Sequence, residues 1–260
     1  MIPVATVGAV IVWTTAFLDG GAAAWPATLD FWTRATATRL SAPRGPDDEF
    51  VTLLPDDGVA FLRAQRTTTG APRVHLDVHV DDVRRAADEA VALGARQVLS
   101  ARHVLLSSPG GLPFCVVAAD GIEGPRPAPR RWTAPDGRSH TSLLDQLAVD
   151  VPADRWEPEV RFWQALTGWA ARPHDPGASL VPLVRGDGMP LRILLQRLDE
   201  PTGAVRAHLD VACDDRPAET ARHVGLGAQV ERVRERWTVL VDPAGRRYCL
   251  TDRDPATGEG

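Results

Sequence analysis

The chain has 260 residues, of which 44% are apolar and 24% charged, which is enough for two domains that each bury a core. Its formal net charge is −5 and it lacks a basic stripe with interleaved aromatic residues, which argues against nucleic acid or an anionic membrane as the main partner. The apolar residues 2–17 have no basic flank and are too few to span a bilayer, so we interpret them as a buried strand rather than a signal peptide.

In the first half, the most informative strand pattern places His75, Asp77 and His79 in alternation with aliphatic residues. A period of two puts these three polar side chains on one face of a strand. Asp81 or Asp82 can cap the following helix, which is expected to end at a glycine. The patterns predict strands over 7–18, 50–54, 59–65, 73–80, 97–106 and 113–119, and helices over 25–39 and 83–93.

The second half follows the same order of elements. A hairpin turn at 242–245 leads into its last strand. The order of one strand, one helix and three strands is therefore expected four times along the chain. The patterns predict strands over 143–151, 178–184, 191–197, 206–213 and 248–251, and helices over 156–167 and 218–224.

An internal duplication accounts for this regularity. Six landmarks recur in the same order at nearly constant offsets of 131 to 134 residues, which predicts two homologous halves. The landmarks are Phe31-Trp32 with Phe162-Trp163, Gln65-Arg66 with Gln196-Arg197, His75-Leu76-Asp77-Val78 with His208-Leu209-Asp210-Val211, the Asp-Asp pairs that follow, Leu93-Gly94-Ala95 with Leu226-Gly227-Ala228, and Cys115 with Cys249.

The duplication and the composition together suggest the domain boundaries. The segment 121–138 is rich in proline and arginine and has no period, so we expect an extended linker there. The first domain then covers residues 1–120 and the second 139–254, with a frayed tail over 255–260. Three cysteines cannot all pair internally and none belongs to a CxxC motif, so we expect free thiols and a cytoplasmic location.

The order of elements, with the phrases His-Leu-Asp-Val-x-x-Asp-Asp, Leu-Gly-Ala and Asp-Pro-x-Gly-x-x-Tyr-Cys, resembles the glyoxalase/bleomycin-resistance/dioxygenase superfamily, also called the vicinal oxygen chelate superfamily. The chain looks most like the tandem form of its glyoxalase-like domain. The resemblance implies an α+β fold of two tandem domains. Four βαβββ modules would then form curved mixed sheets that enclose cavities.

The resemblance also implies where a metal would bind, because metal-dependent members carry ligands on the first and last strands of each module. The matching positions of the second half are Gln146, Gln196, His208 and Cys249, and those of the first half are Gln65, His75 and Cys115, with Thr14 or Thr15 on its opening strand. None of these residues is a carboxylate, which hard dications prefer as ligands. We therefore expect no metal cofactor, with a divalent ion such as Zn²⁺ as the alternative.

The duplicated histidines are the main candidates for chemistry. His75 and His208 could act as hydrogen-bonding partners or general bases, oriented by Asp77 and Asp210 on the same strand faces. Equally, each His–Asp pair could be a self-satisfied buried couple that only supports the fold.

Other polar residues are candidate ligand contacts. His79 has no counterpart in the second half, where Ala212 stands, and this asymmetry favours the first half as the site of chemistry. Cys115 and Cys249 have apolar neighbours and are expected to act as small wall residues rather than nucleophiles. With Gln65, Gln146 and Gln196 they complete the set of predicted ligand-binding residues.

These residues support three functions. The one we favour is a metal-independent protein that binds or transforms an organic metabolite or antibiotic in an apolar cavity. A metal-dependent lyase or isomerase of the glyoxalase type is the alternative, and a ligand-free interaction module is the third. Whether the chain catalyses or only binds stays open, and four modules in one chain predict a monomer with internal pseudo-two-fold symmetry.

Overall fold

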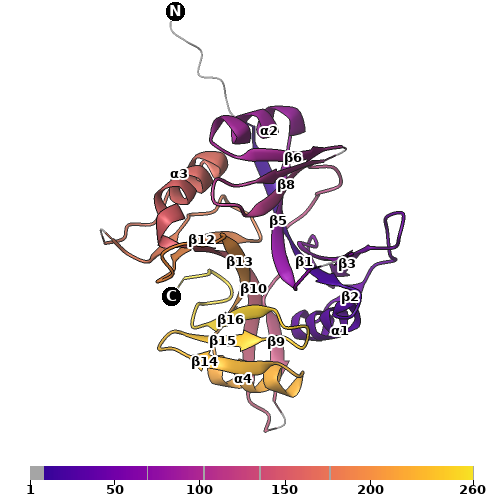
Figure 1. Ribbon diagram of the computed structural model, residues 1–260. Coiled ribbons are helices and arrows are strands. Elements are labelled where there is room, and N and C mark those ends of the chain that lie inside the picture. The colour runs from indigo at the N-terminus through magenta and orange to yellow at the C-terminus, as the bar shows by residue number, and fades with distance from the viewer. Residues whose placement is uncertain (1–8, 69, 102, 135, 176, 260) are drawn as a thin grey trace, which may run out of the picture.

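The computed structural model describes residues 9–68, 70–101, 103–134, 136–175 and 177–259, which form two mixed β-sheets and four α-helices (Figure 1). The predicted first strand falls partly outside this range. The helices are α1 (Trp25–Thr36), α2 (Val83–Ala92), α3 (Trp156–Thr167) and α4 (Arg216–Gly225). The strands are β1 (Ile11–Gly21), β2 (Arg39–Leu40), β3 (Phe50–Leu54), β4 (Leu62–Thr67), β5 (Arg73–Val80), β6 (Arg96–Ser100), β7 (Val104–Ser107), β8 (Pro113–Ala118), β9 (Arg130–Thr133), β10 (Ser139–Val151), β11 (Leu180–Pro182), β12 (Arg192–Arg197), β13 (Arg206–Cys213), β14 (Gln229–Val233), β15 (Trp237–Val241) and β16 (Arg247–Thr251).

Each sheet joins two modules through their opening strands. In the first sheet β1 pairs antiparallel with β5, and in the second sheet β10 pairs antiparallel with β13. Each opening strand also pairs in parallel with the last strand of its own module: β1 with β4, β5 with β8, β10 with β12, and β13 with β16. The predicted α+β architecture of two tandem domains with curved, open sheets is confirmed.

Two details of the second sheet differ from the prediction. The third module has two strands after its helix, β11 and β12, and an isolated bridge between Ala171 and Leu183 takes the place of the missing strand. The segment 121–138 is not wholly an extended linker, because β9 within it pairs antiparallel with β10. The linker therefore contributes a strand to the second domain.

Local sequence signals explain the elements that carry the site. The bounds of β5, α3 and β13 are those that the patterns predict. Asp82 and Asp215 cap α2 and α4, accepting hydrogen bonds from the backbone N–H of Arg85 and Ala218, each at 3.0 Å. Gly94 follows α2 with φ of 107°, a conformation that favours glycine.

The two halves are packed together by an exchange of helices. Helix α1 of the first module lies against the fourth module, as Figure 1 shows at the lower right. The rings of Phe31 and Trp32 lie 5.7 and 5.2 Å from the ring of Tyr248 in β16. Trp32 Nε1 donates a hydrogen bond of 2.8 Å to the carboxylate of Asp242, which also pairs with Arg246.

The equivalent contact in the other direction joins the third module to the second. The rings of Phe162 and Trp163 in α3 lie 5.7 and 5.4 Å from that of Phe114 in β8. Glu159 accepts hydrogen bonds from Trp163 Nε1 and from the Ser108 hydroxyl. The first helix of each half thus packs against the second module of the other half.

Residues 254–259 are folded, so the prediction of a frayed tail was wrong for the part of it that the structure describes. The backbone N–H of Gly258 donates to the Asp254 carbonyl at 2.6 Å, and Arg126 donates to the Ala256 carbonyl at 2.6 Å. Pro255 and Gly258 are buried. Within the described residues, no helix has the length and apolar character needed to cross a bilayer.

Candidate functional site

A cluster of three potential metal ligands lies on two neighbouring strands of the second sheet. Strand β13 supplies His208 and Asp210, which share a face because they are two residues apart. Strand β16 supplies Cys249, which is in register with Asp210. One ligand atom from each of the three lies within 4.8 Å of the others, and His208 Nε2 is 3.3 Å from Asp210 Oδ1. We call these three residues the second triad.

Two residues of β10, Gln146 and Asp150, contact the second triad and line the same cavity as its three members. Asp150 Oδ2 lies 3.0 Å from His208 Nδ1, and Gln146 donates a hydrogen bond from its amide to Asp210. Gln146 therefore orients an acid instead of standing alone as a ligand. Asp150 was missed in the sequence, although it follows Asp19 by 131 residues, the offset that relates the two Phe-Trp pairs.

The surroundings shift the pKa values of the three members of the second triad in different directions. Burial opposes protonation of His208, but the charges of Asp150 and Asp210 hold the pKa of the imidazole well above its ordinary value. Burial likewise opposes ionisation of Asp210, yet the neighbouring His208 keeps the pKa of that carboxyl low. Burial raises the pKa of the Cys249 thiol. An ionised acid thus lies beside a protonated thiol and an imidazole between two carboxylates.

A cavity of about 480 Å³ opens over the second triad. It has the size of a small-molecule site. Gln196, a predicted ligand contact, lies in its wall but outside the triad, and Trp237 adds an aromatic side chain. Besides the second triad, the cavity is also lined by Arg172, Arg192, Arg253 and Gly258.

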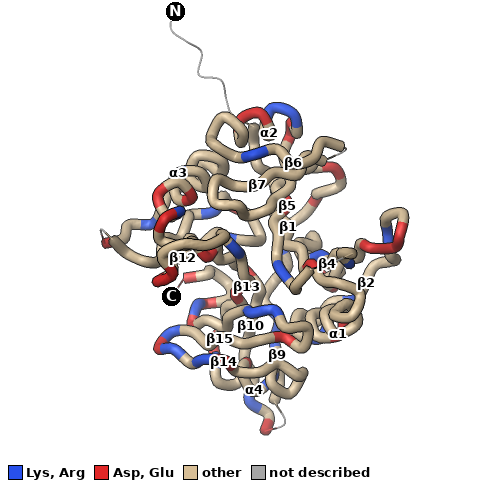
Figure 2. The backbone as a smooth tube through the Cα atoms, viewed as in Figure 1, with Lys and Arg blue, Asp and Glu red and all other residues tan. Residues whose placement is uncertain are grey.

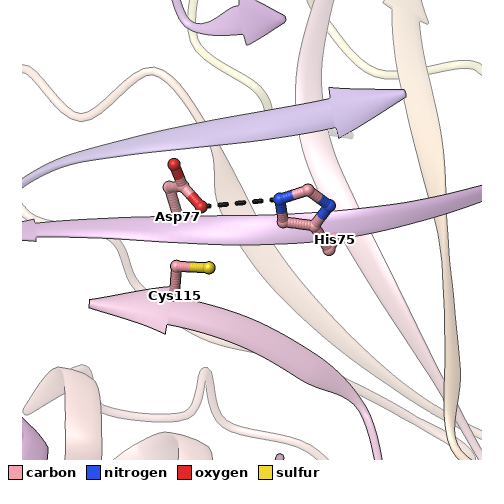
Figure 3. Close-up of side chains that lie close together, drawn as sticks. All are labelled: His75, Asp77 and Cys115. Carbon is pink, nitrogen blue, oxygen red and sulfur yellow. Dashed lines mark ion pairs between the residues drawn. The ribbon is translucent and has the colours of Figure 1, made fainter. Parts of the chain in front are cut away.

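The first half contains the same cluster in a closed setting. His75, Asp77 and Cys115, which we call the first triad, also lie within 4.8 Å of one another (Figure 3). His75 Nδ1 lies 2.9 Å from the carboxylate of Asp19, and its Nε2 lies 3.6 Å from Asp77. Although burial alone would lower it, hydrogen bonding to Asp19 and Asp77 raises the pKa of His75 to about 9. These residues line neither the 480 Å³ cavity nor a second, smaller cavity between the halves.

A large aromatic side chain covers one face of His75 in the first triad. Phe17 stacks on His75 with 4.5 Å between ring centroids, and the Arg63 guanidinium lies over Phe17 at 5.8 Å. In the second half, Ala148 is paired with His208 in the register that Phe17 has with His75. This exchange of phenylalanine for alanine leaves the face of His208 free for a cavity.

The two remaining first-half candidates have structural surroundings. His79 Nε2 lies 2.9 Å from the Thr15 hydroxyl, and burial lowers the pKa of His79 to about 4. Gln65 is half-buried at the end of β4 and, like His79, lines neither of these cavities. The asymmetry introduced by His79 favoured the first half, whereas the 480 Å³ cavity lies over the second.

The second triad has the donor chemistry of a divalent metal site. Imidazole nitrogen, carboxylate oxygen and thiolate sulfur are all ligands of Zn²⁺ and of related transition metals. Ionised Asp210 and Cys249 would carry two negative charges, which match a dication. The buried Asp210 Oδ1 makes no hydrogen bond within the described residues, and Asp150 holds the far nitrogen of His208, as outer partners of metal-bound histidines do. The positions that the resemblance marked contain no carboxylate, but folding brings one to them from Asp210.

Comparisons with known proteins agree with this architecture. A glyoxalase-like domain model matches residues 15–117 and again 146–251. Among solved structures, the chain is similar to the Mn(II)-bound glyoxalase from Novosphingobium aromaticivorans, with a TM-score of 0.63 and 16% identity over 94% of this chain and 82% of that one. An extradiol ring-cleaving dioxygenase from B. fuscum gives a TM-score of 0.63 and 14% identity over 97% of this chain and 74% of that one.

A fusion protein of a xylose isomerase-like TIM barrel and 4-hydroxyphenylpyruvate dioxygenase gives a TM-score of 0.59 and 14% identity; it is matched over 95% of this chain, which spans only 50% of the fusion protein. At these identities the likeness concerns the fold. No curated protein matches the chain. The two matches of the domain model cover most of the sequence, so the chain belongs to the glyoxalase-like domain family and carries two tandem copies of it.

Proposed function

We propose that the second half binds a small organic molecule in the 480 Å³ cavity and transforms it at a divalent metal ion held by the second triad. The observation that carries this proposal is the position of His208, Asp210 and Cys249 in the wall of that cavity. The first triad, under Phe17 and Arg63, then has a structural role. That two of the similar structures are a Mn(II)-bound glyoxalase and an extradiol dioxygenase supports a metal in this fold.

The protein's own groups would each have a defined task. A bound dication would supply Lewis-acid polarisation of a substrate oxygen. Asp150 fixes the ring of His208 through Nδ1, and Gln146 fixes Asp210 through its amide. Such outer contacts orient ligands and tune their basicity. Leu180, Leu194 and Val239 add apolar surface to the cavity wall, against which the carbon skeleton of an organic molecule could pack.

A metal-free site is the second candidate, and one observation favours it. Both ring nitrogens of His208 face carboxylates, Asp150 at 3.0 Å and Asp210 at 3.3 Å. An imidazolium between two acids is satisfied without any ion. In that case Asp210 and His208 would act as a hydrogen-bonding dyad that binds the molecule, in keeping with the metal-independent function that the sequence favours.

Metal content decides between these candidates. Purified protein is incubated with Mn²⁺ or Zn²⁺, desalted, and measured by elemental mass spectrometry. The proposal predicts about one ion per chain, lost in His208→Ala and retained in the matched first-half variant His75→Ala. Protein that retains no ion, or equal retention by both variants, contradicts a metal site at the second triad.

We also propose that the protein is a monomer. The exchange of α1 and α3 between the halves already pairs the four modules within one chain. The aromatic contacts of Phe31 and Trp32 with Tyr248 are buried in this intramolecular interface. A second chain is therefore not needed to complete either sheet or either triad.

A further inference from the structure

A folded segment after β16 reaches into the cavity of the second half. Residues Asp254–Glu259 form a compact loop, closed by the hydrogen bond from the backbone N–H of Gly258 to the Asp254 carbonyl. Gly258 is one of the residues that line the cavity. Figure 1 shows this yellow end of the chain beside β12 and β13. The segment thus occupies space that a bound molecule could otherwise reach.

Two arginines hold this segment. Arg172 donates two parallel hydrogen bonds to the carboxylate of Glu259, and Arg192 donates to the carbonyl of Gly258. Bidentate hydrogen bonds between arginine and a carboxylate are stronger than hydrogen bonds between neutral groups and fix the geometry of the pair. Arg192 is only 5% exposed, so its guanidinium lies in the cavity wall and not on the outer surface.

Positive charge exceeds negative charge around this point. Arg253 pairs with Asp145 at 2.7 Å and Arg172 pairs with Glu259, so each of these two acids already has a cation as its partner. Within the described residues, Arg192 and Arg185 have backbone carbonyls as partners and no carboxylate within ion-pair distance. Figure 2 shows blue segments near β12 and β15. Burial and neighbouring arginines lower the pKa of both Arg185 and Arg192.

An anion would relieve this excess. Burying cations close together is unfavourable unless an opposite charge accompanies them. A carboxylate at Arg192 would provide that charge. The pair with Glu259 shows that the neighbouring Arg172 binds a carboxylate in bidentate geometry. A single cavity would then have a cationic end and, at the second triad, an end that carries the chemistry.

We propose that Arg172 and Arg192 form a subsite for the carboxylate of a small organic acid, and that Gly258 and Glu259 occupy this subsite in the free protein. The inference rests on the proposed function in assigning the bound molecule to this cavity, and it deepens that function by naming the class of ligand. The segment acts as an internal competitor. Only protein in which the segment is undocked can bind the acid, so the apparent affinity is the intrinsic affinity multiplied by the undocked fraction.

Two substitutions release the segment in different ways. Glu259→Gln removes the negative charge that pairs with Arg172. Gly258→Ala leaves the charge unchanged, but a Cβ atom there would lie 2.9 Å from Arg192 Nη1 and 3.0 Å from Asp145 Oδ2, at a φ of +74°. The matched controls are Glu123→Gln, an exposed acid, and Gly137→Ala, which also has positive φ but open space around it.

The experiment is calorimetric titration of the full chain with benzoate and with neutral benzamide. Glu259→Gln is expected to bind benzoate about fivefold more tightly than the unsubstituted chain, because one exposed ion pair is lost. Gly258→Ala should also bind benzoate more tightly, because its Cβ atom clashes with Arg192 and displaces the segment. Benzamide binding and both control variants should not change. In the double variant Glu259→Gln/Arg172→Gln the gain for benzoate should disappear, and Arg172 is exposed enough for this change to be tolerated.

Three outcomes overturn the inference. One is equal benzoate affinity in Glu259→Gln and Glu123→Gln, and another is no benzoate binding by any variant. The third is an equal gain for benzamide, which would make the segment a steric plug without a carboxylate subsite. The metal content of the same samples reports on the second triad independently, so failure of the subsite can be told apart from failure of the proposed function.

Discussion

The imidazole of His75 stacks on the ring of Phe17, with 12° between the ring planes and 4.5 Å between their centroids. Its counterpart His208 is paired with Ala148, which offers no ring. This difference opposite the histidine accompanies a difference in exposure to a cavity: the second triad lines the 480 Å³ cavity, and the first triad lines neither of the two cavities described above. The two halves have kept the same triad and differ in what covers it.

Phe17→Ala tests the structural role of the first triad. Phe17 is 6% exposed, so truncation leaves a cavity over His75 and is expected to lower the free energy of unfolding by about 3 kcal/mol. The matched second-half change, Ala148→Gly, removes no ring and should cost about 1 kcal/mol or less. Urea denaturation followed by circular dichroism measures both. A loss in Phe17→Ala no larger than that in Ala148→Gly would show that the stack does not support the fold.

The interface between the halves depends on a buried ion pair. Asp242 is buried, pairs with Arg246 at 2.8 Å and accepts from Trp32 Nε1. Asp242→Ala leaves the Arg246 cation buried without that partner, so we expect a loss of about 3 to 5 kcal/mol in unfolding free energy. The control Asp30→Ala breaks the exposed pair with Arg34 and should cost less than about 1 kcal/mol. A loss of similar size in the two variants would mean that the contact of α1 with the fourth module contributes little to the free energy of unfolding.

Glu219 makes stability depend on pH. Although burial opposes ionisation, hydrogen bonds with Arg222 and His223 hold the pKa of the Glu219 carboxyl well below its ordinary value. A depressed pKa in the folded state contributes stability above the unfolded value of about 4.3 and loses that contribution as pH falls below it. The unfolding free energy of the wild type should thus exceed that of Glu219→Gln at pH 7, and the difference should shrink in acid below about pH 4.3. Guanidinium denaturation at several pH values, with Glu123→Gln as the control, measures this difference, and a difference that grows on acidification would contradict it.

The internal pairing of modules predicts the state in solution. Because α1 and α3 complete the packing within one chain, sedimentation equilibrium should give the mass of a single chain, 28.1 kDa, across the accessible concentrations. A stable dimer would imply a further interface on the outer faces of the sheets.

Much of the architecture could be predicted because the spacing of apolar residues within short segments indicates strands and helices. The alternation in 73–80 and the helical spacing in 156–167 predict β5 and α3 with their observed bounds. The constant offset between the repeats predicts the two tandem domains. The shortened third module and the strand β9 were not predicted, because each is defined by backbone pairing, Ala171 with Leu183 and β9 with β10, in segments without a clear strand pattern.

The site was predicted in part. The histidines and Asp210 were identified because the repeated motif draws attention to them, whereas Asp150 was missed, although the same offset from Asp19 could have revealed it. The role of Gln146 depends on its register opposite Asp210, which only the folded sheet fixes. The Phe17-to-Ala148 exchange is visible in the sequence, but its consequence for the cavity depends on stacking across two strands.

The most direct test of a metal site in the second half is the absorption spectrum of the protein loaded with Co²⁺. If His208, Asp210 and Cys249 hold the ion, the spectrum should show a thiolate-to-cobalt charge-transfer band that disappears in Cys249→Ser and persists in Cys115→Ser. The absence of such a band in the unsubstituted protein, or its persistence in Cys249→Ser, would contradict the proposal.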